Sequence, residues 1–260
     1  MGFKVVIPAR FASTRLPGKP LLDIGGRTLI QRVVLQACAS AAEEVLVATD
    51  DPRIAASVEA LSEPRRVPAV LTAPELASGT DRVAAVAAAC GWTEDAIVVN
   101  VQGDEPFLPA TLIDEVAALL AADPSAKIAT LAVPVRSLEE FLDPNAVKLV
   151  RRADGSALYF SRAPIPWTRD GAADGRLAGQ TQFSGALRHL GIYAYRVGAL
   201  ARIIRLPTSP LEQIERLEQL RALEHGLRIV VGLASTAPGP GVDTPADLER
   251  ARRLVGEKGP

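Results

Sequence analysis

Short apolar runs alternate with amphipathic helical patterns through the first 122 residues, and this alternation restricts the fold more than any other feature of the chain. The runs lack polar alternation, which is typical of strands buried on both faces of a parallel sheet. They are Lys4–Ile7, Val45–Ala48, Ala69–Leu71 and Ala96–Val101. In such a sheet, ligands bind at the carboxyl ends of the strands. The sequence therefore predicts an α/β fold whose informative residues directly follow these four runs.

The second half of the chain has a different pattern, in which strand-like runs follow one another without regular helices between them. A segment rich in Pro, Gly and Asp, residues 162–187, interrupts these runs. The predicted elements are strands at 128–133, 147–150, 157–160, 189–195 and 229–231, one helix over 211–223 that ends before Gly226, and a helix over 246–255. We expect a single domain, 1–260, with a smaller mixed β subdomain inserted at 145–195.

Composition and charge exclude several classes of protein. The 29 basic and 30 acidic residues give a net charge of -1, which argues against general binding of nucleic acid or of anionic membranes. No apolar run approaches the roughly 18 residues of a membrane-spanning helix. The first residues enter a strand pattern without a signal peptide, so we expect a cytoplasmic protein. Cys38 and Cys90 form neither a metal motif nor a disulfide framework, and we expect both to be buried.

A basic loop follows the first predicted strand. Residues 8–20, PARFASTRLPGKP, contain three cations, Arg10, Arg15 and Lys19, together with Gly18, which lets the backbone approach a ligand closely. Such a loop is suited to neutralise a triphosphate, whose chemistry depends on positioning and charge. Its spacing matches neither the Walker A motif nor the glycine fingerprint of NAD-linked dehydrogenases. The competing interpretation is a solvated basic loop.

Polar residues follow two further strands. Asp104 comes after the strand that ends at Val101, where a carboxylate suits Mg²⁺, although a turn in the segment GDEP would also explain it. The triplet at 78–80, SGT, precedes a helix, where free N–H groups favour an anion or where its hydroxyls simply cap the helix. Near the end of the chain, Thr244 and Pro245 suit the start of a helix and leave Asp243 available.

Several blocks, taken in order, resemble the cytidylyltransferases that activate acidic sugars, and within them the 3-deoxy-manno-octulosonate cytidylyltransferase family. The N-terminal window P-A-R-x-x-S-x-R-L-P-G-K-P is the first of these, and the resemblance extends over residues 3–255. The other blocks are SGTDR at 78–82, NVQGDEP at 100–106, YFSRAPIPW at 159–167, RHLGIY at 188–193, and SPLE at 209–212 with GVDTP at 241–245.

The resemblance implies a Rossmann-like nucleotidyltransferase fold and assigns residues to the nucleotide. CTP would be bound by Pro8, Ala9, Arg10, Arg15, Lys19, Ser78, Gly79, Thr80, Arg82 and Gln102. Arg10, Lys19 and Asp104 would be catalytic, and Asp104 and Asp243 would bind Mg²⁺ as the cofactor. The chain departs from the family pattern at Ala73, where Arg or His is common, and at Leu76, where His is common.

The resemblance also assigns residues to the second substrate, a 3-deoxy-2-ulosonic acid. Arg162 would meet the sugar carboxylate with its planar guanidinium, and His189, Tyr193 and Glu212 would bind the rest of the sugar. Taken alone, Arg162 would be a surface ion pair and His189 a packed histidine. The family further implies a homodimer formed through the smaller β subdomain, without nucleic acid or membrane partners, and a product, CMP-KDO, that is used in lipopolysaccharide synthesis.

The reaction implied is direct attack of the anomeric hydroxyl of 3-deoxy-D-manno-octulosonate (KDO) on the α-phosphorus of CTP, with release of pyrophosphate. Two other interpretations remain open. One is a sugar nucleotidyltransferase that uses another nucleotide or another acid sugar, such as a nonulosonate or an amino analogue. The other is a non-catalytic nucleotide-binding protein with the same fold, which would have lost the phosphate cations or metal carboxylates that this chain keeps.

Overall fold

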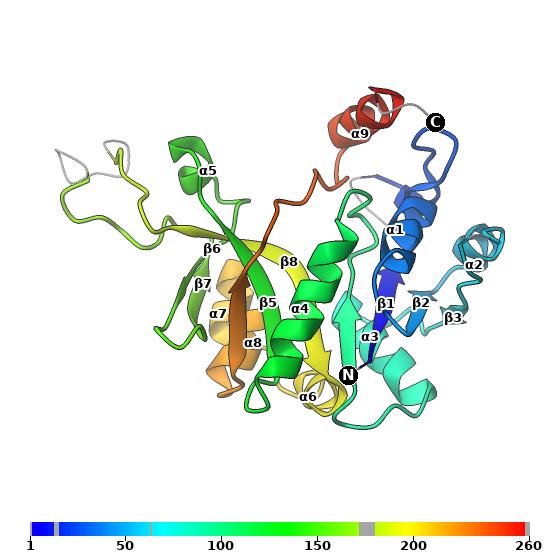
Figure 1. Cartoon of the computed structure of the whole chain (residues 1–260), viewed down its shortest axis with the longest axis horizontal. Helices are drawn as coiled ribbons and strands as arrows, with labels where there is room; N and C mark the ends of the chain where they lie inside the picture. Colours follow the sequence, from blue (N-terminus) through cyan, green and yellow to red (C-terminus); the bar gives the residue numbers. More distant parts are fainter. Residues whose placement is uncertain (1, 13–15, 63, 172–179, 258–260) are drawn as a thin grey trace.

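The strands of the computed structural model, which describes residues 2–12, 16–62, 64–171 and 180–257, form one mixed sheet. Their order along its main path is β3-β2-β1-β4-β8-β5-β9, and β6 and β7 pair beside β8 (Figure 1). The bounds are β1 Phe3–Ala9, β2 Glu44–Thr49, β3 Ala69–Leu71, β4 Ile97–Asn100, β5 Ile128–Pro134, β6 Lys148–Arg151, β7 Ala157–Ser161, β8 Leu187–Arg196 and β9 Ile229–Leu233. The predicted α/β fold with a largely parallel central sheet is therefore confirmed.

Strand direction divides the sheet into two parts. β1 pairs in parallel with β2 and β4, and β2 pairs in parallel with β3. β8 runs antiparallel to both β4 and β5, whereas β5 and β9 are parallel to each other. Because β1 to β4 share one direction, the segments that follow them emerge along the same edge of the sheet.

Helices cover both faces of the sheet. One apolar core unites the face of β1 that carries Val5 and Ile7 with α1, α2 and α4, and the other unites the face that carries Val6 with α3, α6 and α8. The bounds are η1 Lys19–Leu21, α1 Leu29–Cys38, α2 Pro52–Glu59, α3 Gly79–Ala89, α4 Ala110–Ala122, α5 Leu138–Leu142, α6 Val197–Ile203, α7 Pro210–Glu215, α8 Gln219–Glu224 and α9 Pro245–Glu257. Every residue of β4 is buried, as a strand covered on both faces requires.

The helix predicted over 211–223 is two helices, α7 and α8, so that prediction is wrong. Arg216 ends α7 in the left-handed conformation with a φ of 55°, and the chain changes direction there. The prediction took the apolar residues of this stretch to be one buried helix face. In α7, however, the buried residue is Glu212, and the apolar Ile214 is 78% exposed. Helices α5 and α6 were not predicted.

The region predicted as a smaller β subdomain, 145–195, is joined to the main sheet through β8. On one side, β8 pairs with β5 from Leu187 to Tyr195. On its other side, the first residues of β8 pair with β6 and the last residues pair with β4. In Figure 1 the hairpin of β6 and β7 lies with α5 at the end of the molecule opposite β3 and α2. The division of the chain at 145–195 remains a prediction.

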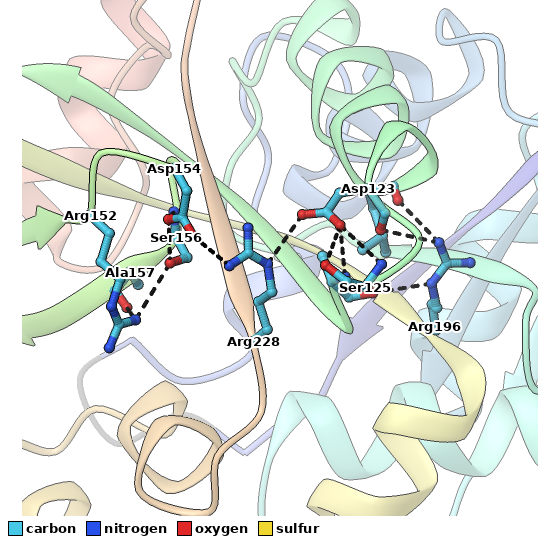
Figure 2. Close-up of polar contacts among 10 residues, drawn as sticks. Asp123, Ser125, Arg152, Asp154, Ser156, Ala157, Arg196 and Arg228 are labelled. Carbon is cyan, nitrogen blue, oxygen red and sulfur yellow. Dashed lines mark hydrogen bonds and ion pairs between the residues drawn. The ribbon is translucent and has the colours of Figure 1, made fainter.

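An ion-pair network fastens this hairpin to the sheet at the edge where β5 and β9 begin (Figure 2). Arg228 donates to Asp154 in the turn of the hairpin at 2.8 Å and to Asp123 after α4 at 3.2 Å. Asp123 also accepts the backbone N–H of Ser125 at 2.9 Å. The Arg228 guanidinium and the Ser156 hydroxyl hold the pKa of Asp154 below its usual value. These contacts are structural, since they lie at the edge opposite the carboxyl ends of β1 to β4.

Two further properties of the described residues bear on the sequence-based expectations. None of their helices combines the length and the apolar character needed to cross a membrane. The expectation that both cysteines are buried is wrong, because Cys38 is half-buried and Cys90, at the end of α3, is exposed. Cys90 lies after the last turn of its helix, where the chain faces solvent rather than the core.

Candidate functional site

A cavity of about 780 Å³ lies at the edge of the sheet where β1 and β4 end. Most of the predicted nucleotide and metal residues line it: Pro8, Ala9, Arg10, Lys19, Gly79, Thr80, Arg82, Gln102, Asp104 and Asp243. Tyr193, predicted to bind the sugar, lines it too. Ser78 does not line this cavity, and Arg15 falls outside the described residues.

The basic loop is shaped by two close contacts. Gly18 adopts a left-handed conformation with a φ of 65° and precedes the short helix η1, and its backbone lies against the Phe11 ring. On the other side, a Cβ atom added at Gly103 would lie 2.7 Å from the carbonyl oxygen of Pro8. The segment after β4 thus packs directly on the end of β1, which brings Asp104 close to the start of the loop.

Lys19 joins the two predicted metal ligands. Its ammonium lies 2.8 Å from a carboxylate oxygen of Asp104 and 2.9 Å from one of Asp243, and its side chain is 13% exposed. Asp104 follows β4, whereas Asp243 precedes α9, so residues far apart in sequence meet at one cation. The Thr244 hydroxyl accepts the N–H of Asp247 at 3.2 Å, as the predicted helix start requires.

The two predicted metal ligands, Asp104 and Asp243, would supply only part of the coordination of a magnesium ion. In the described portion of the chain, no group of three or more His, Cys, Asp and Glu side chains is arranged to hold a metal. Mg²⁺ commonly uses one or two carboxylates and takes its other ligands from water and substrate phosphates. Asp104 and Asp243 supply such a pair at the cavity, so the chemistry of the donors is compatible with Mg²⁺ bound together with a nucleotide.

The N-terminus of α3 forms a second wall of the cavity. The Ser78 hydroxyl accepts the N–H of Asp81 at 3.1 Å, and the Asp81 carboxylate accepts the N–H of Ser78 at 2.9 Å. Capping therefore occupies Ser78, as the competing interpretation held. Gly79 and Thr80 still line the cavity, where the positive end of the helix favours an anion or a ring acceptor.

Further residues line the cavity on the side of β4 and β8. They are Asn100, Tyr195, Glu218 and Gln219, and the sequence analysis assigned none of them to the site. Among the described residues, the buried Asn100 side-chain oxygen and the Tyr193 hydroxyl lack hydrogen-bond partners. Burial raises the pKa values of Tyr193 and of Glu218. A polar ligand would satisfy these groups, because unpaired buried polar atoms are costly.

Two of these missed residues left a signal in the sequence. Asn100 is the single polar residue of an otherwise apolar strand, and Tyr195 stands two residues after Tyr193, so an extended strand places both tyrosines on one face. Their rings stack with centroids 5.7 Å apart. Glu218 and Gln219 gave no signal, because they fall between the apolar positions that define the single predicted helix over 211–223.

His189 lines a smaller, separate cavity of about 320 Å³. Its Nε2 atom lies 2.9 Å from the Thr130 hydroxyl, and the Phe160 ring packs edge-on against it at 5.2 Å. Burial, with a smaller contribution from the charge of Arg188, lowers the pKa of His189 to about 3. Glu105 lines the same cavity, and burial together with the charges of Asp104 and Asp243 raises its pKa to about 7.

Gln102 is shared by the two cavities, and its side chain donates to the Gly191 carbonyl at 2.9 Å. This amide connects the segment after β4 to β8. Gln102, which was predicted to bind the nucleotide, therefore lies between the large cavity and the smaller cavity that His189 lines.

Arg162 and Glu212 line neither cavity. Arg162 donates to the carbonyl oxygens of Glu215 at 2.6 Å and Pro144 at 2.9 Å. Glu212 caps α7 and forms a two-bonded ion pair with Arg221, with N to O distances of 2.8 and 2.5 Å. Of the four predicted sugar residues, the structure places one in the large cavity, one in the small cavity and two in contacts with the rest of the fold.

Comparison with known proteins shows relatives along the full chain. A family model described as cytidylyltransferase matches residues 4–229. A 3-deoxy-manno-octulosonate cytidylyltransferase of Nitrosococcus oceani is 52% identical over 256 residues, which cover 98% of this chain and 97% of that protein. The protein of the same name from Methylococcus capsulatus is 51% identical, over 99% of this chain and 98% of its own length.

Solved structures agree with these sequence matches. A CMP:2-keto-3-deoxy-manno-octonic acid synthetase in complex with CTP superposes with a TM-score of 0.87 at 40% identity, covering 99% of this chain and all of that one. A 4-diphosphocytidyl-2C-methyl-D-erythritol synthase superposes over 98% of both chains with a TM-score of 0.63 at 15% identity, which indicates a shared fold.

Proposed function

This chain belongs to the cytidylyltransferase family, and from that premise we propose that it couples CTP to 3-deoxy-D-manno-octulosonate, releasing pyrophosphate. The anomeric oxygen of the sugar forms a bond to the α-phosphorus, the bond from that phosphorus to the bridging oxygen breaks, and the hydroxyl proton is released. The observation that carries the proposal is the meeting of Lys19, Asp104 and Asp243 in the cavity at the ends of β1 and β4.

Arg10 and Lys19 neutralise the triphosphate and the departing pyrophosphate. Both line the cavity on the basic loop, and Arg10 reaches the Ala77 carbonyl at 3.5 Å. Because the reaction moves charge onto the leaving group, fixed cations stabilise its transition state more than the ground state. Arg15 has the same role in the proposal, on the strength of the family motif.

Asp104 and Asp243 hold Mg²⁺ in this proposal, and bound Mg²⁺ would supply charge neutralisation at the phosphates. The pairing of both carboxylates with Lys19 keeps them together at the cavity. Lys19 therefore has two roles, since it positions the carboxylates and carries positive charge toward the triphosphate.

The cytosine and ribose lie against Gly79, Thr80 and Arg82, and the acidic sugar takes the side of the cavity near β8. Tyr193 and Asn100 offer the unpaired buried polar atoms on that side, which suits a ligand rich in hydroxyl groups. Arg162, His189 and Glu212 belong to the sugar side by resemblance. Arg162 would have to leave its two carbonyl partners to reach the cavity.

The remaining proposals concern the protein in its cell. The protein acts in the cytoplasm as a homodimer joined through the β6–β7 region, and its product is used in lipopolysaccharide synthesis. Exposed apolar residues on neighbouring edges, Leu158 of β7 and Leu233 of β9, support a partner surface there. Light scattering of the purified protein would give the mass of a dimer, and Leu158→Asp would reduce it toward that of a monomer.

The test of the reaction is pyrophosphate release from CTP, Mg²⁺ and KDO. Parallel reactions omit the sugar, omit Mg²⁺, replace CTP by UTP or GTP, or replace KDO by a nonulosonate. We expect release only with CTP and KDO, and loss of release in Asp104→Asn. Release with a nonulosonate but not with KDO would change the assigned substrate. This comparison is included because the chain departs from the family pattern at Ala73 and Leu76. No release with any acid sugar would contradict the proposal.

A further inference from the structure

Asp50 follows β2 directly and contacts two separate walls of the large cavity without lining it. One oxygen of its carboxylate accepts the backbone N–H of Phe11 in the basic loop at 3.2 Å. The other oxygen accepts from the Arg82 guanidinium of α3 at 2.8 Å. The aspartate is thus shared between the loop that carries Arg10 and Lys19 and the helix that begins at the SGT triplet.

Arg82 forms an ion pair with this carboxylate. Its side chain is 2% exposed and lines the cavity, and the carboxylate of Asp50, itself 12% exposed, is the countercharge beside it. The same guanidinium donates to the Thr72 hydroxyl at 2.6 Å and to the Ala73 carbonyl at 3.3 Å. Arg82 therefore fastens the end of β3 to α3, and Asp50 fastens that group to the end of β2.

On the opposite side, Asp50 holds Phe11, whose ring contacts the described part of the basic loop at Gly18. The Phe11 ring lies against Gly18, the residue before Lys19, and the Arg53 guanidinium covers the ring 3.7 Å from its centre. Phe11 follows Arg10 directly in the chain, two residues after the end of β1. A displacement of Phe11 would therefore move the backbone that carries Arg10 and Lys19.

We propose that Asp50 is a positioning residue for CTP, whose single carboxylate holds the phosphate-facing loop and the nucleoside-facing wall at a fixed distance from each other. This inference rests on the proposed function only in that CTP is the nucleotide. A triphosphate nucleotide spans both walls, so its affinity depends on their relative position. These two hydrogen bonds of the Asp50 carboxylate go to the basic loop and to α3, not to β4 or β8 on the sugar side of the cavity.

The test compares Asp50→Asn with a matched aspartate elsewhere. Asp123 also accepts a backbone N–H, that of Ser125, and an arginine donor, from Arg228 (Figure 2). It lies between α4 and the start of β5, at the edge of the sheet opposite the cavity. We expect Asp50→Asn to raise the Kd for CTP, measured by calorimetry without sugar, about tenfold or more, because a charged hydrogen bond to a buried group is lost. The KM for KDO should change less than twofold, and Asp123→Asn should leave both constants unchanged.

A second measurement asks whether Asp50 acts through Arg82. In a double-mutant cycle with Arg82→Gln, the Asp50→Asn substitution should weaken CTP binding much less than it does in the wild-type background. Additive effects would overturn the shared-wall inference. So would an unchanged Kd in Asp50→Asn, equal losses for CTP and KDO, or a variant that does not fold, which would make the role of Asp50 purely structural. A wild-type protein that fails to bind CTP would instead overturn the proposed function.

Discussion

The parallel and antiparallel parts of the sheet hold their predicted site residues in different ways. In the parallel part, the segments after β1 and β4 and before α3 bring the nucleotide residues to one cavity. In the antiparallel part, Tyr193 reaches that cavity, His189 lines another, and Arg162 and Glu212 are bonded to the fold itself. On one side of the site, most of the predicted residues surround one cavity, whereas on the other side half of the predicted residues are engaged elsewhere.

The difference follows from the topology. The segments that follow parallel strands all leave the sheet at one edge. Residues that follow different strands therefore lie close together there, even when they form no contact with one another. The segments that follow antiparallel neighbours leave the sheet at opposite edges. A residue near β8 therefore lies at the site only if the path of that strand or of its loop passes the cavity. The comparison predicts that changes on the nucleotide side act strongly on catalysis, while changes on the sugar side act mainly on the affinity for one substrate.

The largest effect is expected from Lys19→Met, which removes the cation between Asp104 and Asp243. Loss of a fixed group that stabilises the developing charge typically costs about 100- to 1,000-fold in kcat. Pyrophosphate release at saturating CTP and KDO measures it. Lys127→Met, at an exposed position before β5, is the control and should retain wild-type activity. A kcat for Lys19→Met within tenfold of wild type would show that the carboxylates do not need this partner.

The nucleotide side could be predicted from the sequence because its residues obey the topological rule. Pro8, Gly79 and Asp104 each stand close to a strand end or a helix start that the hydrophobic pattern locates, and Lys19 belongs to the basic loop that follows the first of these strands. The meeting of Asp104 and Asp243 at Lys19 could not be worked out from spacing, since the two aspartates are 139 positions apart in the sequence; the family resemblance assigned both to one metal site.

The sugar side could be predicted only in part, for three physical reasons. The pairing of β5 with β8 shifts between Thr130 and Leu131, and no pattern in the sequence marks this shift. The break at Arg216 separates α7 from α8 and turns Glu218 into the cavity wall, although Arg rarely adopts positive φ. Finally, Arg162 forms hydrogen bonds to backbone carbonyls, and the positions of these carbonyls cannot be predicted from a sequence pattern.

A smaller and more selective effect is expected from Glu215→Ala. The Glu215 carboxylate accepts the Ser161 hydroxyl at 2.6 Å and the N–H of Arg162 at 2.9 Å, so it fixes the backbone from which Arg162 projects. If Arg162 binds the sugar, the KM for KDO should rise about tenfold, the cost of one hydrogen bond to a charged group. The KM for CTP should stay within twofold.

Steady-state kinetics with each substrate varied in turn would separate these two constants. Glu59→Ala, at the exposed end of α2, is the control and should change neither. A rise in the KM for CTP as large as that for KDO would remove the distinction between the two sides of the site. An unchanged KM for KDO would argue that the segment around Arg162 does not take part in binding the sugar.

The smallest effect concerns stability and tests whether His189 behaves as a packed residue. Its pKa is lowered from 6.5 in the unfolded chain to about 3, because its ring is buried. Between these values the unfolded chain binds more protons than the folded protein, so stability falls as the pH drops below 6.5. From pH 7 to pH 5.5 this group alone removes about 1 kcal/mol, or about 2 °C in Tm for a chain of this size.

Replacing the ring by an amide removes that contribution. We expect the Tm of wild type to fall about 2 °C more than that of His189→Gln between pH 7 and pH 5.5, measured by differential scanning calorimetry. Between pH 7 and pH 8 the two proteins should change in parallel, since the ring is then uncharged in the folded protein and mostly uncharged in the unfolded chain. Parallel changes at low pH as well would mean that His189 takes up a proton in the folded protein. The ring would then be open to solvent, and as an imidazolium it could meet the carboxylate of the acidic sugar directly.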